Sequence, residues 1–183
     1  MNLTIKKKKV GIYRMTNDEK RSMAVPMTKI YLATEWFNDE QKERAQKAVE
    51  ALNANPTVGV IHMPFDFQYK DATIDNDPEG IFGSTVWIQS TFENDIHAMS
   101  TSDMCVALIN LDKNDPGELM ECGFMYAYHK PIYVVPFTED PDNAEINLML
   151  AGVTTDYINK IEDLSKINFN HPQADFTTPY PTF

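Results

Sequence analysis

The stretch Met104–Gly123, MCVALINLDKNDPGELMECG, predicts the fold of this chain. Its first eight residues are almost all apolar, which is typical of a buried strand, and the Asp-Pro-Gly that follows is typical of a chain leaving a sheet. The residues from Gly117 onward predict the first turns of a helix. Open α/β sheets bind their ligands outside the carboxyl ends of the strands. Asp115 and Glu121 are therefore placed where chemistry is expected.

Two interpretations of these carboxylates are open at this point. Asp115 and Glu121 can divide the roles of nucleophile and general acid between them. Acidic residues in the first turns of a helix are also favoured by the helix dipole, without any catalytic role. Their position alone does not decide between the two interpretations.

The composition indicates one globular domain rather than a disordered or membrane-spanning chain. Of the 183 residues, 43% are hydrophobic and 23% are charged. No apolar run approaches the roughly 20 residues that cross a bilayer. Residues 1–28 contain seven Lys or Arg and two acidic residues, and we expect them to be a disordered basic extension of a domain over residues 29–183. That domain carries 9 basic and 25 acidic residues, so we expect no nucleic-acid polymer as a partner.

The expected ligand is small and neutral or nearly so, because the sequence contains no P-loop or glycine-rich phosphate cradle. The two cysteines, Cys105 and Cys122, fall on a predicted strand and the following helix in apolar company. They are typical of core residues in a reducing cytoplasm rather than of a disulfide. The four histidines show no metal-ligand spacing, so we expect no metal site.

Apolar periodicity divides the domain into alternating strands and helices, which predicts a three-layer α/β domain with a parallel sheet of about five strands. The expected strands are Lys29–Ala33, Val58–Met63, Met104–Leu111, Pro131–Pro136 and Val153–Tyr157. The expected helices lie between Asn38 and Asn55, at Thr85–Met99, from Gly117 to His129 and at Asn143–Ala151, with a helical turn at Leu164–Phe169. The polar loop from Pro64 to Gly83 is long for a compact domain, which favours a function for it.

Several side chains that can do chemistry fall at the predicted strand ends, and each also has a plain structural interpretation. Tyr31 can be a core residue, and Asp95 can belong to a solvated helix face. Gln68 and Asn147 can be loop hydrogen-bonders. The pair Trp36-Phe37 is either plain packing or a stacking platform for an aromatic ligand. The candidates are Tyr31, Trp36, Phe37, Gln68, Asp95, Asp115, Glu121, Asn147 and Met149.

Four motifs, taken together, resemble the nucleoside 2-deoxyribosyltransferase family. They are Ile-Tyr-Leu-Ala-x-x-Trp-Phe at 30–37, Asn-Asp at 94–95, Asp-x-Gly-x-x-Met-Glu-x-Gly at 115–123 and Ile-Asn-Leu-Met at 146–149. The resemblance covers residues 29–183 and implies a flavodoxin-like or Rossmann-like fold. It also implies a homo-oligomer, a hexamer by family resemblance, with no cofactor. Its substrates would be 2′-deoxynucleosides and free nucleobases, between which a 2-deoxyribosyl group moves in nucleoside salvage.

The resemblance implies roles for four side chains. Glu121 matches the nucleophile that attacks the anomeric carbon to form a covalent deoxyribosyl-enzyme, and Tyr31 matches the residue that positions it. Asp95 and Asp115 match the acidic pair that binds the base and supplies protons to it, with the donor between them left open. Because the departing base leaves an oxocarbenium-like sugar, a nearby carboxylate stabilises and then captures it, and two displacements retain the configuration.

The same resemblance implies further site residues and reveals one departure. Gln68 matches the base-orienting glutamine, and Asn147 matches the residue that a neighbouring subunit donates to the sugar hydroxyl. Met149 is expected beside the nucleophile, and Phe183 is expected to be the aromatic residue whose terminal carboxylate reaches an active site. Glu118 stands where the family often has a small residue, and its charge is expected to raise the pKa of the nucleophile.

Two alternatives compete with the transferase. A deoxynucleoside 5′-monophosphate N-glycosidase would need a cradle for the 5′-phosphate, which the motifs do not supply. A phospho-acceptor signalling module on a similar fold would need an acidic pair at the end of the first strand, where Thr34-Glu35-Trp36 supplies one acid. The loop Phe65–Gln68 suggests acceptance of both purines and pyrimidines, but the family includes purine-only members, so both specificities stay open.

Overall fold

The computed structural model describes residues 27–183. The predicted basic extension over residues 1–28 lies outside this range except for its last two residues, and Thr28 already belongs to the first strand. The strands are β1 (Thr28–Ala33), β2 (Val58–His62), β3 (Met104–Asn110), β4 (Ile132–Phe137) and β5 (Asp156–Tyr157). The α-helices are α2 (Asp39–Asn53), α3 (Thr85–Thr101), α4 (Pro116–Ala127) and α5 (Leu148–Val153). The 3₁₀-helices are η1 (Pro64–Phe67), η2 (Tyr69–Asp71) and η3 (Ile161–Ser165).

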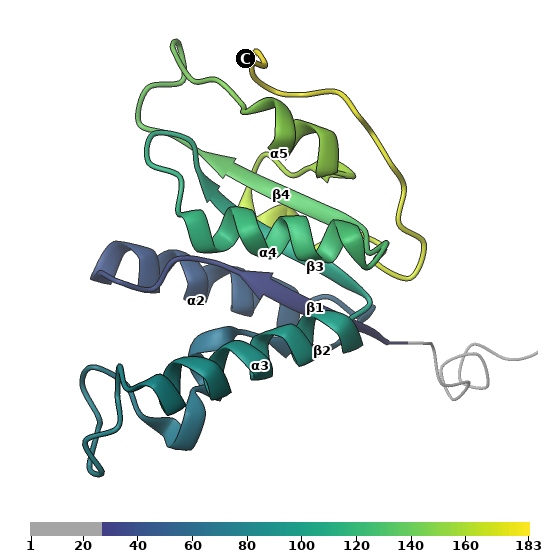
Figure 1. The fold of residues 1–183 in the computed structure, drawn as a ribbon. Coiled ribbons are helices and arrows are strands. Elements are labelled where there is room, and N and C mark those ends of the chain that lie inside the picture. The colour runs from purple at the N-terminus through teal and green to yellow at the C-terminus, as the bar shows by residue number, and fades with distance from the viewer. Residues whose placement is uncertain (1–26) are drawn as a thin grey trace, which may run out of the picture.

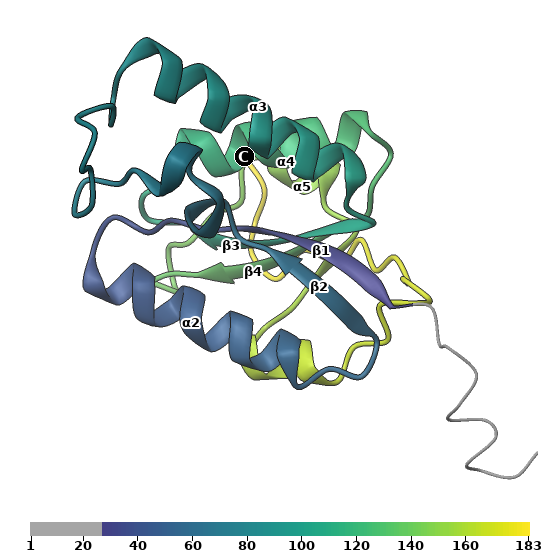
Figure 2. The ribbon, with the colours of Figure 1, turned by 90° about the horizontal axis from the view of Figure 1, so that it is seen from below.

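The strands form one parallel sheet in the order β2-β1-β3-β4-β5. This is the strand order of flavodoxin-like folds, and it confirms the predicted three-layer α/β class. Helices α3, α4 and α5 cover one face of the sheet, and α2 with η3 covers the other (Figures 1 and 2). Within the described residues, no helix is long and apolar enough to cross a membrane.

Both faces of β1 are buried, and its alternation assigns each side chain to one layer. Ile30 and Leu32 pack in the cluster that contains α2, whereas Tyr31 and Ala33 pack in the cluster that contains α3 and α4. A strand buried on both faces is typical of the centre of a parallel sheet. The alternation therefore directs the Tyr31 hydroxyl into the layer of α3 and α4, where the site is built.

The predicted start of α2 is confirmed. The Asn38 side chain accepts a hydrogen bond from the Gln41 amide at 2.9 Å, and the Gln41 side chain accepts one from the Asn38 amide at 3.1 Å. This reciprocal capping box satisfies two of the amides that a helix leaves without partners at its start. It fixes the point at which the chain turns away from the carboxyl end of β1.

Two predicted helical segments are placed differently by the structure. The predicted helix Asn143–Ala151 begins only at Leu148, because the Asn147 side chain caps α5, Asn143 lies in a turn and Ile146 pairs with Thr182 of the C-terminal tail. The predicted turn at Leu164–Phe169 is instead η3. The side-chain amide of the buried Asn55 donates to the carbonyls of Leu164, at 2.6 Å, and Ile167, at 2.7 Å. These carbonyls therefore have a partner outside a helix.

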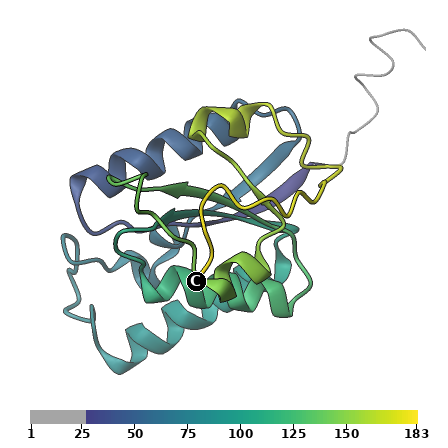
Figure 3. The ribbon, with the colours of Figure 1, turned by 90° about the horizontal axis from the view of Figure 1, so that it is seen from above.

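The C-terminal segment passes from the layer of η3 to the layer of α5 (Figure 3). Along the way, the Tyr133 hydroxyl donates to the Gln173 carbonyl at 3.1 Å. At its end, the Phe183 amide donates to the Ile146 carbonyl at 3.2 Å. The tail therefore connects both layers and lies beside the start of α5.

Candidate functional site

A tyrosine and a glutamate form the centre of the site. The Tyr31 hydroxyl donates a hydrogen bond to Glu121 Oε1 at 2.7 Å. Tyr31 is fully buried on β1, and Glu121 is partly buried in the second turn of α4. Burial and the neighbouring Glu121 raise the pKa of Tyr31 far above its ordinary value, so the phenol stays protonated and donates. Sequence reasoning brought these two residues together only through the family resemblance, and the structure does place them in contact.

The N-terminus of α4 fixes the position of Asp115, the first of the two acids near Glu121. Asp115 is the N-cap, and its Oδ2 accepts a hydrogen bond from the Glu118 amide at 3.0 Å. Pro116 follows at the first helical position, where its fixed φ angle suits the helix. A Cβ placed on Gly117 would lie 2.7 Å from Asp115 Oδ2. Glycine at this position therefore leaves room for the carboxylate that caps the helix.

Asp95 comes from α3, and Asp115 and Glu121 come from the N-cap and the second turn of α4. The charges of Asp95 and Asp115 act on the pKa of Glu121. The pKa of Glu121 is raised to about 7, because burial and the nearby charges of Asp95 and Asp115 raise it by more than the hydrogen bond from Tyr31 lowers it. Near neutral pH this carboxyl therefore exists in both its ionised and its protonated form. A buried carboxyl whose pKa is raised in this way beside other acids is typical of acid–base sites.

The second acid, Asp95 on α3, faces a histidine. Asp95 Oδ1 lies 3.9 Å from His62 Nε2, and both atoms are buried without a hydrogen-bond partner among the described residues. The His62 ring is stacked between Phe67, with centroids 4.3 Å apart, and Tyr31, at 5.6 Å. In the sequence His62 is only one of four histidines without metal-ligand spacing. Its place at the end of the second predicted strand is the one signal that could have pointed to the site.

Gln68 lies at the wall of a cavity of about 410 Å³ that His62, Phe67 and Asn94 also line. Its side-chain amide donates to the Pro64 carbonyl at 2.9 Å, which holds it against η1. The cavity falls within the roughly 300–1,000 Å³ that small-molecule sites occupy. The long loop from Pro64 onward therefore contributes a wall of this cavity, which His62 also lines but which none of Asp95, Asp115 and Glu121 lines.

Trp36 and Phe37 form an aromatic cluster with Phe65 at the carboxyl ends of β1 and β2. The Trp36 and Phe65 ring centroids are 5.6 Å apart, and those of Phe37 and Phe65 are 6.1 Å apart. Trp36 is half-buried, whereas Phe37 is exposed. The contacts fit both packing and a stacking platform, because one ring is fixed and another is open to solvent.

Three predicted site residues are not joined to the acids within one chain. The Asn147 side chain accepts from the Met149 amide at 2.9 Å and so caps α5, and the Met149 side chain is 72% exposed. The Phe183 carbonyl accepts a hydrogen bond from the Leu148 amide at 3.0 Å. Among residues 27–183, none of these three has a hydrogen bond to Glu121, Asp95 or Asp115.

Glu118 is the departure from the family, and it is buried. The residue is 2% exposed, and neither carboxyl oxygen has a hydrogen-bond partner among the described residues. Burial, together with the charges of Glu35, Asp115 and Glu121, raises the pKa of Glu118 to about 9. The pKa of Glu121 is raised, as expected, but burial and the charges of Asp95 and Asp115 raise it, and Glu118 is not among the causes. At neutral pH Glu118 is a protonated carboxyl, and Glu121 is one cause of its shift.

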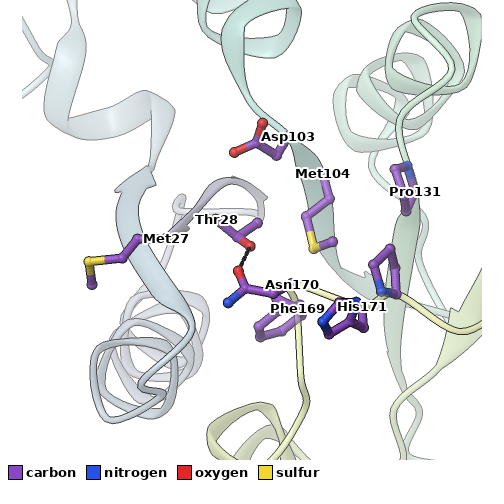
Figure 4. A pocket seen from close by; sticks show the side chains of 9 residues that line it. Met27, Thr28, Asp103, Met104, Pro131, Phe169, Asn170 and His171 are labelled. Carbon is purple, nitrogen blue, oxygen red and sulfur yellow. Dashed lines mark hydrogen bonds between the residues drawn. The ribbon is translucent and has the colours of Figure 1, made fainter. Parts of the chain in front are cut away.

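A second hollow lies at the opposite edge of the sheet, where the strands begin (Figure 4). It has a volume of about 400 Å³ and is lined by Met104 and Phe169, among others, and the Thr28 hydroxyl donates to Asn170 Oδ1 at 3.0 Å there. None of Asp95, Asp115 and Glu121 lines it.

Within the described residues, no group of three His, Cys, Asp or Glu side chains is placed to hold a metal ion.

Known proteins resemble the chain in both sequence and structure. The family model described as nucleoside 2-deoxyribosyltransferase matches residues 30–161. A nucleoside deoxyribosyltransferase of Limosilactobacillus fermentum is 51% identical over 90% of this chain and 98% of its own length. One of Lactobacillus leichmannii is 36% identical over 83% of this chain and 96% of its own length. A solved 2-deoxyribosyltransferase of Bacillus psychrosaccharolyticus is 26% identical, with a TM-score of 0.62 over 80% of this chain and 96% of that chain.

Two glycines of α4 provide a matched test of the cap. Gly117→Ala is expected to displace the Asp115 carboxylate, and the loss of about 1 kcal/mol of N-cap stabilisation should cancel most or all of the gain in helix propensity, so that the unfolding free energy rises little or not at all. A Cβ on Gly123 would meet no atom within 4 Å. Gly123→Ala is therefore expected to stabilise the protein by about 0.5–1 kcal/mol. Urea unfolding measures both values, and equal stabilisation by the two substitutions would contradict the role of Gly117.

The buried Glu118 carboxyl makes stability depend on pH. The folded state holds a proton on Glu118 up to about pH 9, whereas the unfolded state releases it near the ordinary glutamate pKa of 4.5. The folded state therefore binds more protons between pH 5 and 9, and its contribution to unfolding free energy falls there by up to about 1.4 kcal/mol per pH unit.

Glu118→Gln is expected to remove this contribution, most clearly between pH 7 and 9, above the raised pKa of Glu121, and Glu50→Gln, on the exposed side of α2, is expected to keep it. Urea unfolding of the three proteins at intervals from pH 5 to 9 measures the difference. The same slope in the wild type and in Glu118→Gln would show that Glu118 is ionised in the folded protein.

Proposed function

The chain belongs to the nucleoside 2-deoxyribosyltransferase family, and from this premise we propose that it transfers a 2-deoxyribosyl group between nucleobases through a covalent bond to Glu121. The observation that carries the proposal is the 2.7 Å hydrogen bond from Tyr31 to Glu121, next to the charges of Asp95 and Asp115. This arrangement supplies an oriented carboxylate together with acids beside it. The proposal leaves open whether the bases are purines, pyrimidines or both.

In the first half-reaction, one oxygen of the ionised Glu121 attacks the anomeric carbon of a 2′-deoxynucleoside. The bond from that carbon to the base nitrogen breaks, its electron pair goes to the base, and an acid supplies a proton to a ring nitrogen. Tyr31 holds Oε1 by a hydrogen bond, which leaves the other carboxylate oxygen to attack. Asp95 and Asp115 are the acids within reach, and Gln68 orients the base in the adjoining cavity.

In the second half-reaction, an incoming base displaces Glu121 from the same carbon. Two displacements on one carbon retain the configuration, as in retaining glycosidases. Water would hydrolyse the intermediate, so the site must exclude it. The expected role is nucleoside salvage, and the two free, buried cysteines, Cys105 and Cys122, agree with a reducing cytoplasm.

A homo-oligomer would supply the residues that one chain does not bring to the acids. Large apolar side chains are more than half exposed on the layer of α3, α4 and α5: Phe92, Met120, Leu148 and Met149. The Phe92 and Phe124 rings are 6.4 Å apart, so the patch is continuous from α3 to α4. Exposed apolar patches mark interaction surfaces. We therefore extend the proposal to an oligomer, a hexamer by family resemblance, in which Asn147 and Met149 reach a neighbour's site.

The competing functions receive less support from the described residues. The cavity beside Gln68 is lined by Asp66 and Asp71 against a single Lys29, which disfavours the phosphate of a deoxynucleoside monophosphate. A phospho-acceptor site would need more than Glu35 after β1, and Glu35 Oε2 already accepts a hydrogen bond from Gln41 at 2.7 Å. The transferase is the function that these charges fit.

The proposal predicts both the product and its dependence on Glu121. With deoxyinosine or thymidine as donor and adenine or cytosine as acceptor, the wild type is expected to form a new nucleoside. Glu121→Gln is expected to lower exchange by at least about 10³-fold, because it removes the nucleophile. Its thermal unfolding and the activity of Glu50→Gln should match the wild type. Free deoxyribose as the main product, with or without acceptor, would establish a hydrolase instead.

If the subunits share their sites, two inactive variants should restore activity to each other in a mixed oligomer. Glu121→Gln and Asn147→Ala are each expected to be nearly inactive alone, because every site lacks one group. In mixed oligomers purified through two different tags, about a quarter of the sites combine an intact Glu121 with an intact Asn147 from the neighbour, if subunits mix at random. Exchange activity should recover to about that fraction. No recovery in oligomers shown by mass to be mixed would contradict a role of Asn147 across subunits.

A further inference from the structure

Two buried polar atoms face each other near the proposed nucleophile without forming a hydrogen bond. His62 Nε2 and Asp95 Oδ1 are 3.9 Å apart, and neither has a hydrogen-bond partner among the described residues. A buried polar atom without a partner costs about 1–3 kcal/mol, so two that face each other indicate a contact made during function. Catalytic hydrogen bonds are often long before substrate binds, and they shorten in the complex.

The protein holds the His62 ring in one orientation. Tyr31 and His62 are register partners on β1 and β2, so their side chains lie on the same face of the sheet. The ring is stacked on Phe67 at 4.3 Å and on Tyr31 at 5.6 Å between centroids. Because Tyr31 also holds Glu121, the histidine is tied to the same group of residues as the nucleophile.

We propose that His62 is a positioning residue for proton transfer, which holds the proton that Asp95 passes to the departing base. The proposal rests on the proposed transferase function. It also assigns the donor between the two acids. Asp95 has the histidine behind it, whereas the Asp115 carboxylate is engaged as the cap of α4.

The proton and the electrons balance over the two half-reactions. As the bond between the anomeric carbon and the base breaks, its electron pair goes to the base. The proton on His62 Nε2 moves to Asp95 Oδ1, and the Asp95 carboxyl gives its proton to a ring nitrogen of the base. His62 changes from imidazolium to neutral imidazole, and Asp95 ends as the carboxylate it was. The incoming base returns a proton along the same path as its bond to the sugar forms.

Two substitutions separate proton supply from packing. His62→Phe keeps an aromatic ring between Tyr31 and Phe67 and removes both nitrogens. His62→Gln keeps an N–H donor toward Asp95 that cannot release its proton. His171→Gln, exposed at the opposite edge of the sheet, is the matched control (Figure 4).

The measurement is the single-turnover rate of base release across 2′-deoxynucleosides whose bases differ in basicity. The limiting member is 7-methyl-2′-deoxyguanosine, whose cationic base leaves without a proton. Both His62 variants are expected to slow release about 100-fold for bases that need a proton, the lower end of general-acid effects. The loss should shrink as the base becomes a better leaving group and should nearly vanish for the methylated substrate. His171→Gln should match the wild type throughout.

Each outcome decides the proposal. The same loss for every leaving base would show a structural role for His62 and would overturn it. Full activity of His62→Gln would show that a hydrogen bond to Asp95 suffices, and would also overturn it. If the wild type does not accept the methylated substrate, the slope across the remaining bases decides. If the wild type releases no base at all, the transferase function itself fails, which is a distinct result.

Discussion

The hydrogen bond between the Tyr31 hydroxyl and Glu121 is the interaction on which the rest of the site depends. It joins the interior strand β1 to helix α4, and within residues 27–183 it is the side-chain hydrogen bond of the partly buried Glu121 carboxyl. Burial and two neighbouring acids work against ionisation of Glu121, and the phenol works for it. On the proposed function, a weaker bond would leave the carboxyl protonated and unable to attack. A much stronger ion pair would make it a poor nucleophile and a good leaving group. A neutral donor lies between these limits, since the Tyr31 phenol does not itself ionise.

The number of negative charges that the site can hold is limited by the closeness of its acids. Glu35, Asp115, Glu118 and Glu121 lie close enough to influence one another, and full ionisation of all four would be costly. The structure resolves this conflict at Glu118, the most deeply buried of them, which keeps its proton at neutral pH. The capping amide holds Asp115 in place. The extra carboxyl therefore adds volume and a potential donor near Glu121 without adding a negative charge.

The sequence was sufficient for the fold and for part of the site. Apolar periodicity, the capping box at Asn38 and the strand–turn–helix around Asp115 follow local rules, and the structure confirms them. The contact of Tyr31 with Glu121, 90 residues apart, was expected only because the motifs resemble a family. Nothing local in the sequence indicates that His62 faces Asp95, or that Glu118 turns inward and keeps its proton. Both depend on which helix covers which strand end, which is a property of the packing.

Transfer and hydrolysis differ in what reaches the intermediate after the first base has left. A covalent deoxyribosyl-enzyme on Glu121 survives until a base arrives only if water is kept from the anomeric carbon. A single chain supplies one wall, the aromatic and polar residues of the loop around Phe65 and Gln68. Its α5 side presents the Met149 side chain to solvent and uses Asn147 as a helix cap. On the proposed function, the missing wall comes from another subunit, because the apolar surface of α3, α4 and α5 is the part of this layer that a single chain leaves uncovered. The choice between transfer and hydrolysis would then depend on assembly as much as on the acids.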